Sequence, residues 1–171
     1  TWTLFRSEEF TGFAHRVKED LQSKDLLFAG TEMGLFGSID GGANWFRMKN
    51  NIPWYSLVRD IQIHPVTHDL IIATHGRGIM IVDDISAIRA LTKDVLEKDV
   101  HFFDVKPMIL TNGSFGNGAT SAQGAWVASN APAIPPVYYY LKDRISTGDV
   151  KLDIIDAEGK IIQSIPGTQR K

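Results

Sequence analysis

Short apolar runs alternate with turn residues through the first half of the chain. Each run is at most seven residues long, and Gly, Asp or Pro separates it from the next. Runs of this length and spacing predict β-strands. A helical interpretation fails because the runs are too short and because Gly30, Gly34 and Gly37 interrupt any helical period. The predicted strands span residues 13–19, 25–30, 34–39, 44–48, 57–63, 69–74 and 78–83.

These strands form a repeat. When the sequence is shifted by 44 residues, residues 25–29 fall on residues 69–73, and residues 34–36 fall on residues 78–80. Trp2 and Trp45 are 43 residues apart, so a third copy is expected to end near Trp2. A period of about 40–50 residues with four strands per copy is typical of a β-propeller blade. The sequence therefore predicts an all-β fold with a partial β-propeller of about two blades, the second lacking its fourth strand.

One turn of the first copy carries a motif. Residues 38–45 read Ser-x-Asp-x-Gly-x-x-Trp, with Ser38, Asp40, Gly42 and Trp45 at the fixed positions. The Asp40 carboxylate is placed to accept hydrogen bonds from backbone N–H groups of its own turn. Gly41 and Gly42 tolerate positive φ angles, and Trp45 begins the outgoing strand, where it packs beneath the turn. We expect a structural hairpin here.

The motif resembles the bacterial neuraminidase repeat, or Asp box. The wider stretch 17–91 is similar to the sortilin-type and glycosyl-hydrolase-like propellers of secreted bacterial proteins, and residues 74–84 resemble the last blade of that family. The resemblance implies an exported protein, located in the periplasm, on the outer surface or outside the cell. It also implies that the Asp box has a structural role, away from the ligand-binding face.

Strand alternation predicts which residues share the opposite face. Successive strands of a blade run antiparallel, so the second-to-third hairpins and the connection between blades emerge together. That face would carry Glu32, Trp54, Tyr55, His75 and Arg77. Aromatic side chains near a Glu, a His and an Arg suit a carbohydrate or peptide contact surface.

Each of these residues also has a purely structural interpretation. Trp54 follows Pro53 and suits packing between blades, Glu32 suits a turn, and residues 75–78 suit a tight hairpin with a solvated Arg77. Asp83 and Asp84 suit a cation site or, for Asp84, a cap where the strand leads into a helix.

The sequence does not contain a complete set of catalytic residues. Glycoside hydrolysis generally needs two carboxylates that flank one bond; the predicted face offers Glu32, and Asp60 only near the start of its strand. The His residues lack metal-ligand spacing, and the Gly-rich stretch 113–118 does not match a phosphate-binding loop. We predict no cofactor and no metal. The leading hypothesis is a module that binds glycan or protein ligands, and the alternative is a glycoside hydrolase-like enzyme with most of its carboxylates elsewhere.

The pattern changes after residue 84. Residues 85–96 predict one or two helical turns, with Ser86 and Thr92 as N-cap candidates, and residues 100–105 predict a strand. Residues 111–136 are rich in Gly, Ala, Ser and Asn and predict a long loop. Strands at 137–141, 150–156 and 160–165 resemble the start of an immunoglobulin-like sandwich, with the middle strand half-buried. The predicted division is propeller blades at 1–84, connector at 85–110, loop at 111–136 and partial sandwich at 137–171.

The composition of the chain argues against several kinds of partner and structural feature. The chain has 171 residues, a formal net charge of −2 and no Cys. The near-neutral charge argues against nucleic acid as a partner, the apolar runs are too short for a membrane helix, and disulfides are excluded. The expected partners are a glycan or peptide ligand and the remainder of the same propeller and sandwich, because residues 1 and 171 read as cut points within a longer protein.

Overall fold

The chain is an all-β protein built from small antiparallel sheets. The computed structural model describes residues 8–49, 51–53, 55–105, 136–143, 145 and 150–167, and within them strands far outnumber helices. Sheet 1 contains β1 (Ala14–Glu19), β2 (Leu27–Thr31), β3 (Gly34–Ser38) and β4 (Phe46–Arg47), in that order. Sheet 2 contains β5 (Val58–Ile63), β6 (Leu70–Thr74) and β7 (Ile79–Val82), in that order. The predicted strands of the first half are confirmed, with bounds that differ by one or two residues.

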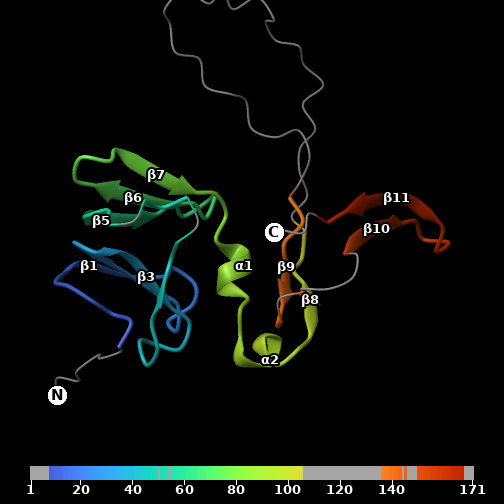
Figure 1. Cartoon of the computed structure of the whole chain (residues 1–171), viewed down its shortest axis with the longest axis horizontal. Helices are drawn as coiled ribbons and strands as arrows, with labels where there is room; N and C mark the ends of the chain where they lie inside the picture. Colours follow the sequence, from blue (N-terminus) through green and yellow to red (C-terminus); the bar gives the residue numbers. More distant parts are fainter. Residues whose placement is uncertain are drawn as a thin grey trace, which may run out of the picture.

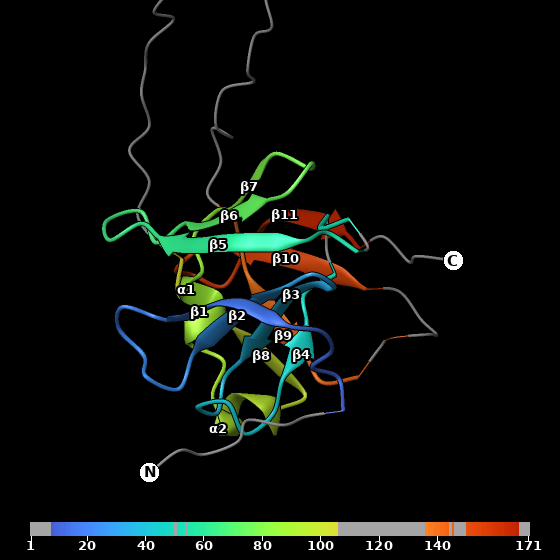
Figure 2. The ribbon, with the colours of Figure 1, turned by 90° about the vertical axis from the view of Figure 1, so that its left-hand side faces the viewer.

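The two sheets pack on each other through one apolar core (Figure 1). Sheet 1 contributes Leu26, Phe28 and Leu35, and sheet 2 contributes Val58, Ile61, Ile63, Leu70 and Ile72. The strands β1 and β2 both contact β5, and Figure 2 shows β5 lying over them. Burial of these branched and aromatic side chains is the main favourable term for the pair of sheets.

Gly30 allows the sheets to approach closely. A Cβ atom at Gly30 would lie 2.5 Å from Cγ1 of Val58 and 3.0 Å from the Val58 backbone oxygen. Any side chain at this position would therefore push β5 away from β2. The contact joins the end of β2 to the start of β5.

The sheets are two copies of one pattern. In both, a register shift interrupts the first strand pair, between Ala14 and Arg16 in sheet 1 and between Val58 and Asp60 in sheet 2. In both, a threonine closes the next hairpin: the Thr31 hydroxyl donates to the Gly34 carbonyl, and the Thr74 hydroxyl donates to the Gly78 carbonyl.

This pattern corrects one part of the sequence alignment. Thr31 corresponds to Thr74, so β2 corresponds to β6 with a shift of 43 residues, and the shift of 44 placed this strand wrongly by one residue. The shift of 44 holds for β1 and β3. The error matters because a slip of one residue exchanges the two faces of a strand.

With the corrected register, the sheets stack front to back. We call the face that carries Phe28 and Gly30 the front of sheet 1; its equivalent in sheet 2 carries Ile71 and Ala73. The front of sheet 1 meets the face of sheet 2 that carries Leu70 and Ile72, which is its back. Repeats in a stacked array contact each other in this way.

Two short helices follow sheet 2, and Figure 1 shows them at the side of the stacked sheets. They are α1 (Ser86–Arg89) and α2 (Lys93–Leu96). Thr92 caps α2 by accepting the N–H of Val95, as predicted. The prediction that Ser86 is an N-cap is wrong: Ile85 occupies that position, and the Asp84 carboxylate accepts the N–H of Ser86. The Asp84 side chain thus bonds to the backbone at the start of the helix, while Ile85 has no side-chain group that could cap it.

The second half forms two separate pairs of strands among the described residues. Strand β8 (Val100–Phe102) pairs with β9 (Tyr139–Leu141), and β10 (Lys151–Ile155) pairs with β11 (Ile161–Pro166). The expected half-burial of the middle strand holds only in part: Val150 and Leu152 are half-buried, whereas Ile154 is 41% exposed and Ile155 is 60% exposed. The predicted loop at 111–136 lies outside the described residues except for its last residue.

Candidate functional site

The connections between strands gather at two ends of the stacked sheets. One end, here called the hairpin end, holds the β2–β3 hairpin, the β6–β7 hairpin and the connection between β4 and β5. The other end, here called the motif end because it carries residues 38–45, holds the β1–β2, β3–β4 and β5–β6 turns. The structure thus places these site residues at the hairpin end, on three different connections: Glu32 between β2 and β3, Tyr55 between β4 and β5, and His75 and Arg77 between β6 and β7. Trp54 lies outside the described residues.

Glu32 fastens the segment before β1 to the β2–β3 hairpin. Its Oε2 accepts the backbone N–H of Phe13 at 2.7 Å and lies 3.8 Å from Nε2 of His15. Gly12, with φ of +90°, passes so close that a Cβ there would lie 2.8 Å from the Glu32 carboxyl group. These contacts give Glu32 a structural role at the rim of the candidate site.

Tyr55 and Arg47 form a stacked pair at the same end. The Arg47 guanidinium carbon lies 5.7 Å from the centre of the Tyr55 ring, within the range of a cation–π contact. Nη2 of Arg47 also donates to the Met33 carbonyl, which joins the pair to the β2–β3 hairpin. Tyr55 has a φ of 59° and is 60% exposed, so its ring is presented to solvent.

The β6–β7 hairpin joins the same connection from the other side. The N–H of His75 donates to the Leu57 carbonyl at 2.9 Å, and Gly76 and Gly78 both have φ of 75°. The side chains of His75 and Arg77 are exposed. The connection between β4 and β5 is therefore bonded to both hairpins, through Arg47 and through Leu57.

Asp60 is engaged as an ionised group. Its carboxylate accepts from the Gln62 amide and the Ile61 N–H and lies 3.2 Å from Nε of Arg16. The bond from Gln62, followed by that from Ile61 and the charge of Arg16, holds the pKa of Asp60 below its ordinary value. A carboxyl group in this state does not serve as a proton donor near neutral pH.

The turn at residues 38–45 satisfies its own polar side chains at the motif end. Asp40 accepts the backbone N–H of Asn44 at 2.8 Å, the Asn44 side-chain amide at 2.7 Å and the Ser38 hydroxyl at 2.9 Å. The Ser38 hydroxyl in turn accepts the N–H of Gly42. Burial opposes ionisation of Asp40, but the bonds from Asn44 and Ser38 outweigh it and lower its pKa. The expected role of the carboxylate in its own turn is confirmed.

Trp45 completes the turn. Its indole N–H donates to the Gly42 carbonyl at 3.0 Å, and the side chain is 7% exposed. Its ring packs on Phe10 with centroids 5.1 Å apart. Gly41 and Gly42 have φ angles of 70° and 91°, as expected. All four fixed positions of the motif therefore act within the hairpin itself.

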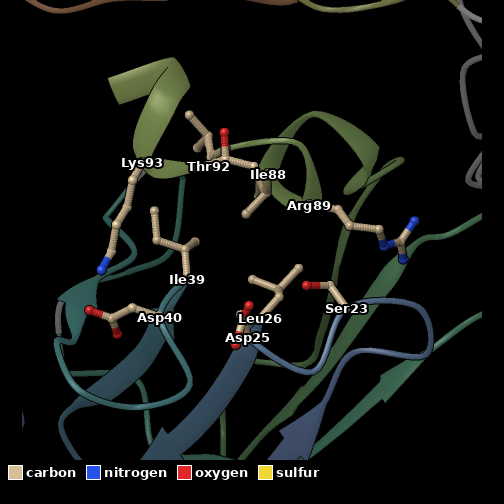
Figure 3. A pocket seen from close by; sticks show the side chains of 10 residues that line it. Ser23, Asp25, Leu26, Ile39, Asp40, Ile88, Arg89, Thr92 and Lys93 are labelled. Carbon is tan, nitrogen blue, oxygen red and sulfur yellow. The ribbon is translucent and has the colours of Figure 1, made fainter. Parts of the chain in front are cut away.

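A pocket of about 260 Å³ also lies at the motif end (Figure 3). Leu26, Ile39 and Ile88 form part of its wall, and Asp25 and Lys93 carry charges at it. Arg89 also lines it but is engaged by Asp20. Asp40 lines the pocket as well, with its carboxylate bonded to Asn44 and Ser38. Two of the four charged side chains at the pocket, Arg89 and Asp40, are thus engaged by other residues of the chain.

Metal binding has no support in the part of the chain that the structure describes. No group of three or more His, Asp or Glu side chains is placed there to hold an ion. Asp84, one of the two residues considered for a cation, accepts the N–H of Ser86 instead. Neither helix of the described residues is long and apolar enough to cross a bilayer.

Sequence reasoning missed two side-chain pairs. The buried Asp20 carboxylate binds Nε and Nη2 of Arg89 at 2.7 and 2.6 Å, across 69 residues of sequence. The stack of Arg47 on Tyr55 was missed as well. Neither pair has a local sequence signal, because each joins different elements and depends on how the sheets and helices pack.

The comparisons with known proteins give no relative: no family model, no curated protein and no solved structure matches this chain.

Proposed function

We propose that sheets 1 and 2 belong to a β-propeller of the Asp-box type in an exported bacterial protein, and that the hairpin end binds a glycan or protein ligand. The observation that carries the proposal is the difference between the two ends. At the motif end, the side chains of residues 38–45 bond to their own turn. At the hairpin end, Tyr55, His75 and Arg77 are exposed on connections that are held in place by hydrogen bonds.

The architecture supports the propeller part of the proposal. Two antiparallel sheets with the same strand order stack front to back, with their first strands β1 and β5 in contact. Successive blades around a propeller axis are related in this way. The self-bonded turn at residues 38–45 supports an Asp box, whose role is to close the third-to-fourth hairpin of a blade.

The chemistry of the hairpin end supports ligand binding. A tyrosine ring offers a flat apolar surface with a polar tip, and this combination recurs in recognition sites for glycans and proteins. Arg47 holds the ring from one side, which lowers the entropy lost when a ligand packs on it. His75 and Arg77 add hydrogen-bond donors on the neighbouring hairpin.

Binding can be tested with a glycan array and a peptide panel. We expect Tyr55→Ala to weaken binding by roughly tenfold, the effect of losing about 1.4 kcal/mol from an aromatic anchor. Phe102→Ala is the matched control, because Phe102 is also an exposed aromatic (52%) but lies on β8. If both variants bind as tightly as the unchanged chain, Tyr55 is not part of the binding site. If the unchanged chain binds no member of either panel, the proposal is contradicted.

Hydrolysis of a glycan is the second candidate function, and it would also take place at the hairpin end. It would require Glu32 to act as an acid or nucleophile, although Glu32 is bonded to Phe13 and lies beside His15. We therefore expect no release of reducing sugar from the glycans that bind. Release of reducing sugar that is lost in Glu32→Gln would show that the hairpin end is the active site of an enzyme. The exported location is a separate part of the proposal, and cell fractionation of the source organism tests it.

A further inference from the structure

The front of sheet 2 and the back of sheet 1 are two open surfaces of the same stack. In sheet 1, Leu35 on the front is fully buried under sheet 2. Its equivalent in sheet 2 is Ile79, because Leu35 pairs with Gly30 and Ile79 pairs with Ala73. Ile79 is 71% exposed, and Ile81, two residues on, is 58% exposed. The same face is thus covered in one sheet and open in the other.

The back of sheet 1 is open over its first strand. The position of Val17 in β1 corresponds to that of Ile61 in β5, which is fully buried against sheet 1. Val17 is 55% exposed. Farther out on the same face, Phe10 packs on Phe36 and Trp45, so the open part is the strip along β1.

We propose that a second copy of this chain covers the front of sheet 2 with the back of its own sheet 1, in the same way that sheet 2 covers sheet 1 within one chain. The contact is heterologous, because it joins two different surfaces. Repetition of such a contact closes a ring if the rotation at each step allows it. Propellers contain about four to eight sheets, so two to four chains of two sheets each would complete the ring.

Shape complementarity supports this contact. Within the chain, the close approach pairs Gly30 with Val58. The equivalent positions at the new interface are Ala73 of sheet 2 and Ala14 of the second copy, from the matching strand pairs Ala14 with Thr31 and Val58 with Thr74. The added methyl group at Ala73 is offset by the smaller side chain at Ala14. The combined size of the two side chains therefore stays nearly constant, and a contact of the same spacing can form.

Charge complementarity supports it as well. Arg16 in β1 and Asp60 in β5 occupy equivalent positions, and within the chain they lie 3.2 Å apart. In the proposed contact, Asp60 of one copy faces Arg16 of the next copy. Around a closed ring, these positions would alternate in sign, so each charge would have opposite charges on both sides.

The oligomeric state tests the proposal directly. We expect light scattering after size exclusion of the 171-residue chain to give two to four times the mass of one chain. Ile81→Glu places a charge on the front of sheet 2, and Val17→Glu places one on the back of sheet 1; each variant alone is expected to be monomeric. Both side chains are exposed in the single chain, so folding is expected to persist, and circular dichroism checks this.

Mixing the two variants separates a head-to-tail contact from a symmetric one. Each variant keeps one surface intact, so an equimolar mixture is expected to give a dimer of one chain of each kind and nothing larger. The control is Ile162→Glu, a side chain that is 66% exposed on β11, which should leave the oligomer unchanged. A monomeric unchanged chain overturns the proposal. Self-association of either variant alone overturns the head-to-tail contact, and growth into filaments overturns ring closure.

Discussion

At the scale of single residues, the turn at 38–45 shows how a short motif determines a local structure. Asp40 bonds to two groups of Asn44 and to the Ser38 hydroxyl, while Trp45 bonds to the Gly42 carbonyl. Charge-assisted hydrogen bonds of this kind are stronger than bonds between neutral groups. The carboxylate therefore stabilises the turn more than a neutral side chain would.

Asp40→Ala should lower the free energy of unfolding by about 1–3 kcal/mol, because it removes the charge-assisted hydrogen bonds that Asn44 and Ser38 donate to the carboxylate. Asp25→Ala is the matched control, since Asp25 is an exposed carboxylate at the same pocket. Urea denaturation of both variants measures the difference. Equal stability of the two would show that the Asp40 bonds contribute nothing net.

Asp20 predicts how stability depends on pH. Its side chain is inaccessible to solvent; burial opposes ionisation, but bonds from Arg89 and from the N–H groups of Gln22 and Ser23 hold its pKa below the ordinary value. A group with a lowered folded pKa stabilises the protein above its unfolded pKa, about 3.9 for Asp, and loses that contribution as the pH falls through the folded value.

Asp20→Asn should therefore be less stable than the unchanged chain at pH 7, and the difference should shrink as the pH falls below about 4. Unfolding by urea at a series of pH values measures this. Asp25→Asn, at an exposed carboxylate, controls for the loss of one negative charge. A constant difference between the Asp20 variant and the unchanged chain at all pH values would contradict the assigned cause.

At the scale of elements, the sequence predicts where strands lie better than it predicts which faces meet. Gly and Asp punctuate the first half so regularly that the bounds of β2, β3, β5 and β6 follow from the pattern. The register between copies does not follow, because the β1–β2 turn is one residue longer than the β5–β6 turn. That single residue moves Leu27 rather than Leu26 into equivalence with Leu70.

The sequence likewise does not report which strands pair in the second half of the chain, or which side chains meet at the candidate site. The alternation of apolar and polar residues in β10 predicts a strand, but nothing in the sequence states that β10 pairs only with β11 among the described residues. Strand alternation predicts that one end of the strands carries Glu32, Tyr55, His75 and Arg77. The bond of Glu32 to Phe13 depends on how the chain enters β1, and no spacing rule reports it.

Gly30 provides a test of the contact between sheets. Gly30→Ala should destabilise the chain by about 1–3 kcal/mol, because its Cβ would meet Val58 at 2.5 Å. Val58→Ala should destabilise it by leaving a cavity. The double variant should lose less than the sum of the two, since each change provides the space that the other needs. A double-mutant cycle by urea denaturation measures the coupling, and strictly additive effects would contradict the close approach.

At the scale of the whole molecule, the chain is unevenly packed. Sheets 1 and 2 share a core that includes Phe28, Leu35, Ile61, Leu70 and Ile72. In contrast, every residue of β11 is exposed, including Ile161 and Ile162. Stability in a protein follows such differences in local packing.

Amide hydrogen exchange should therefore divide the chain into two classes. The N–H groups of β2 and β6 should exchange slowest, and those of the β10–β11 hairpin should exchange much faster. Mass spectrometry of peptides after timed exchange measures both in one sample. Equal protection of β6 and β11 would show that the apolar faces of β10 and β11 are covered in solution.

The self-contained turn at residues 38–45 also bears on how such a chain changes over generations. The side-chain hydrogen bonds of the motif start and end within eight residues, so a duplicated copy of the segment would carry these bonds with it; the Gly41 N–H reaches out of the segment, to the Asp25 carbonyl. Meanwhile the exposed loops at the far end of the strands contribute little to that closure. Substitutions in those loops therefore leave the side-chain bonds of the turn intact, so the chemistry of one end of the strands can change over generations while the turn at the other end still closes.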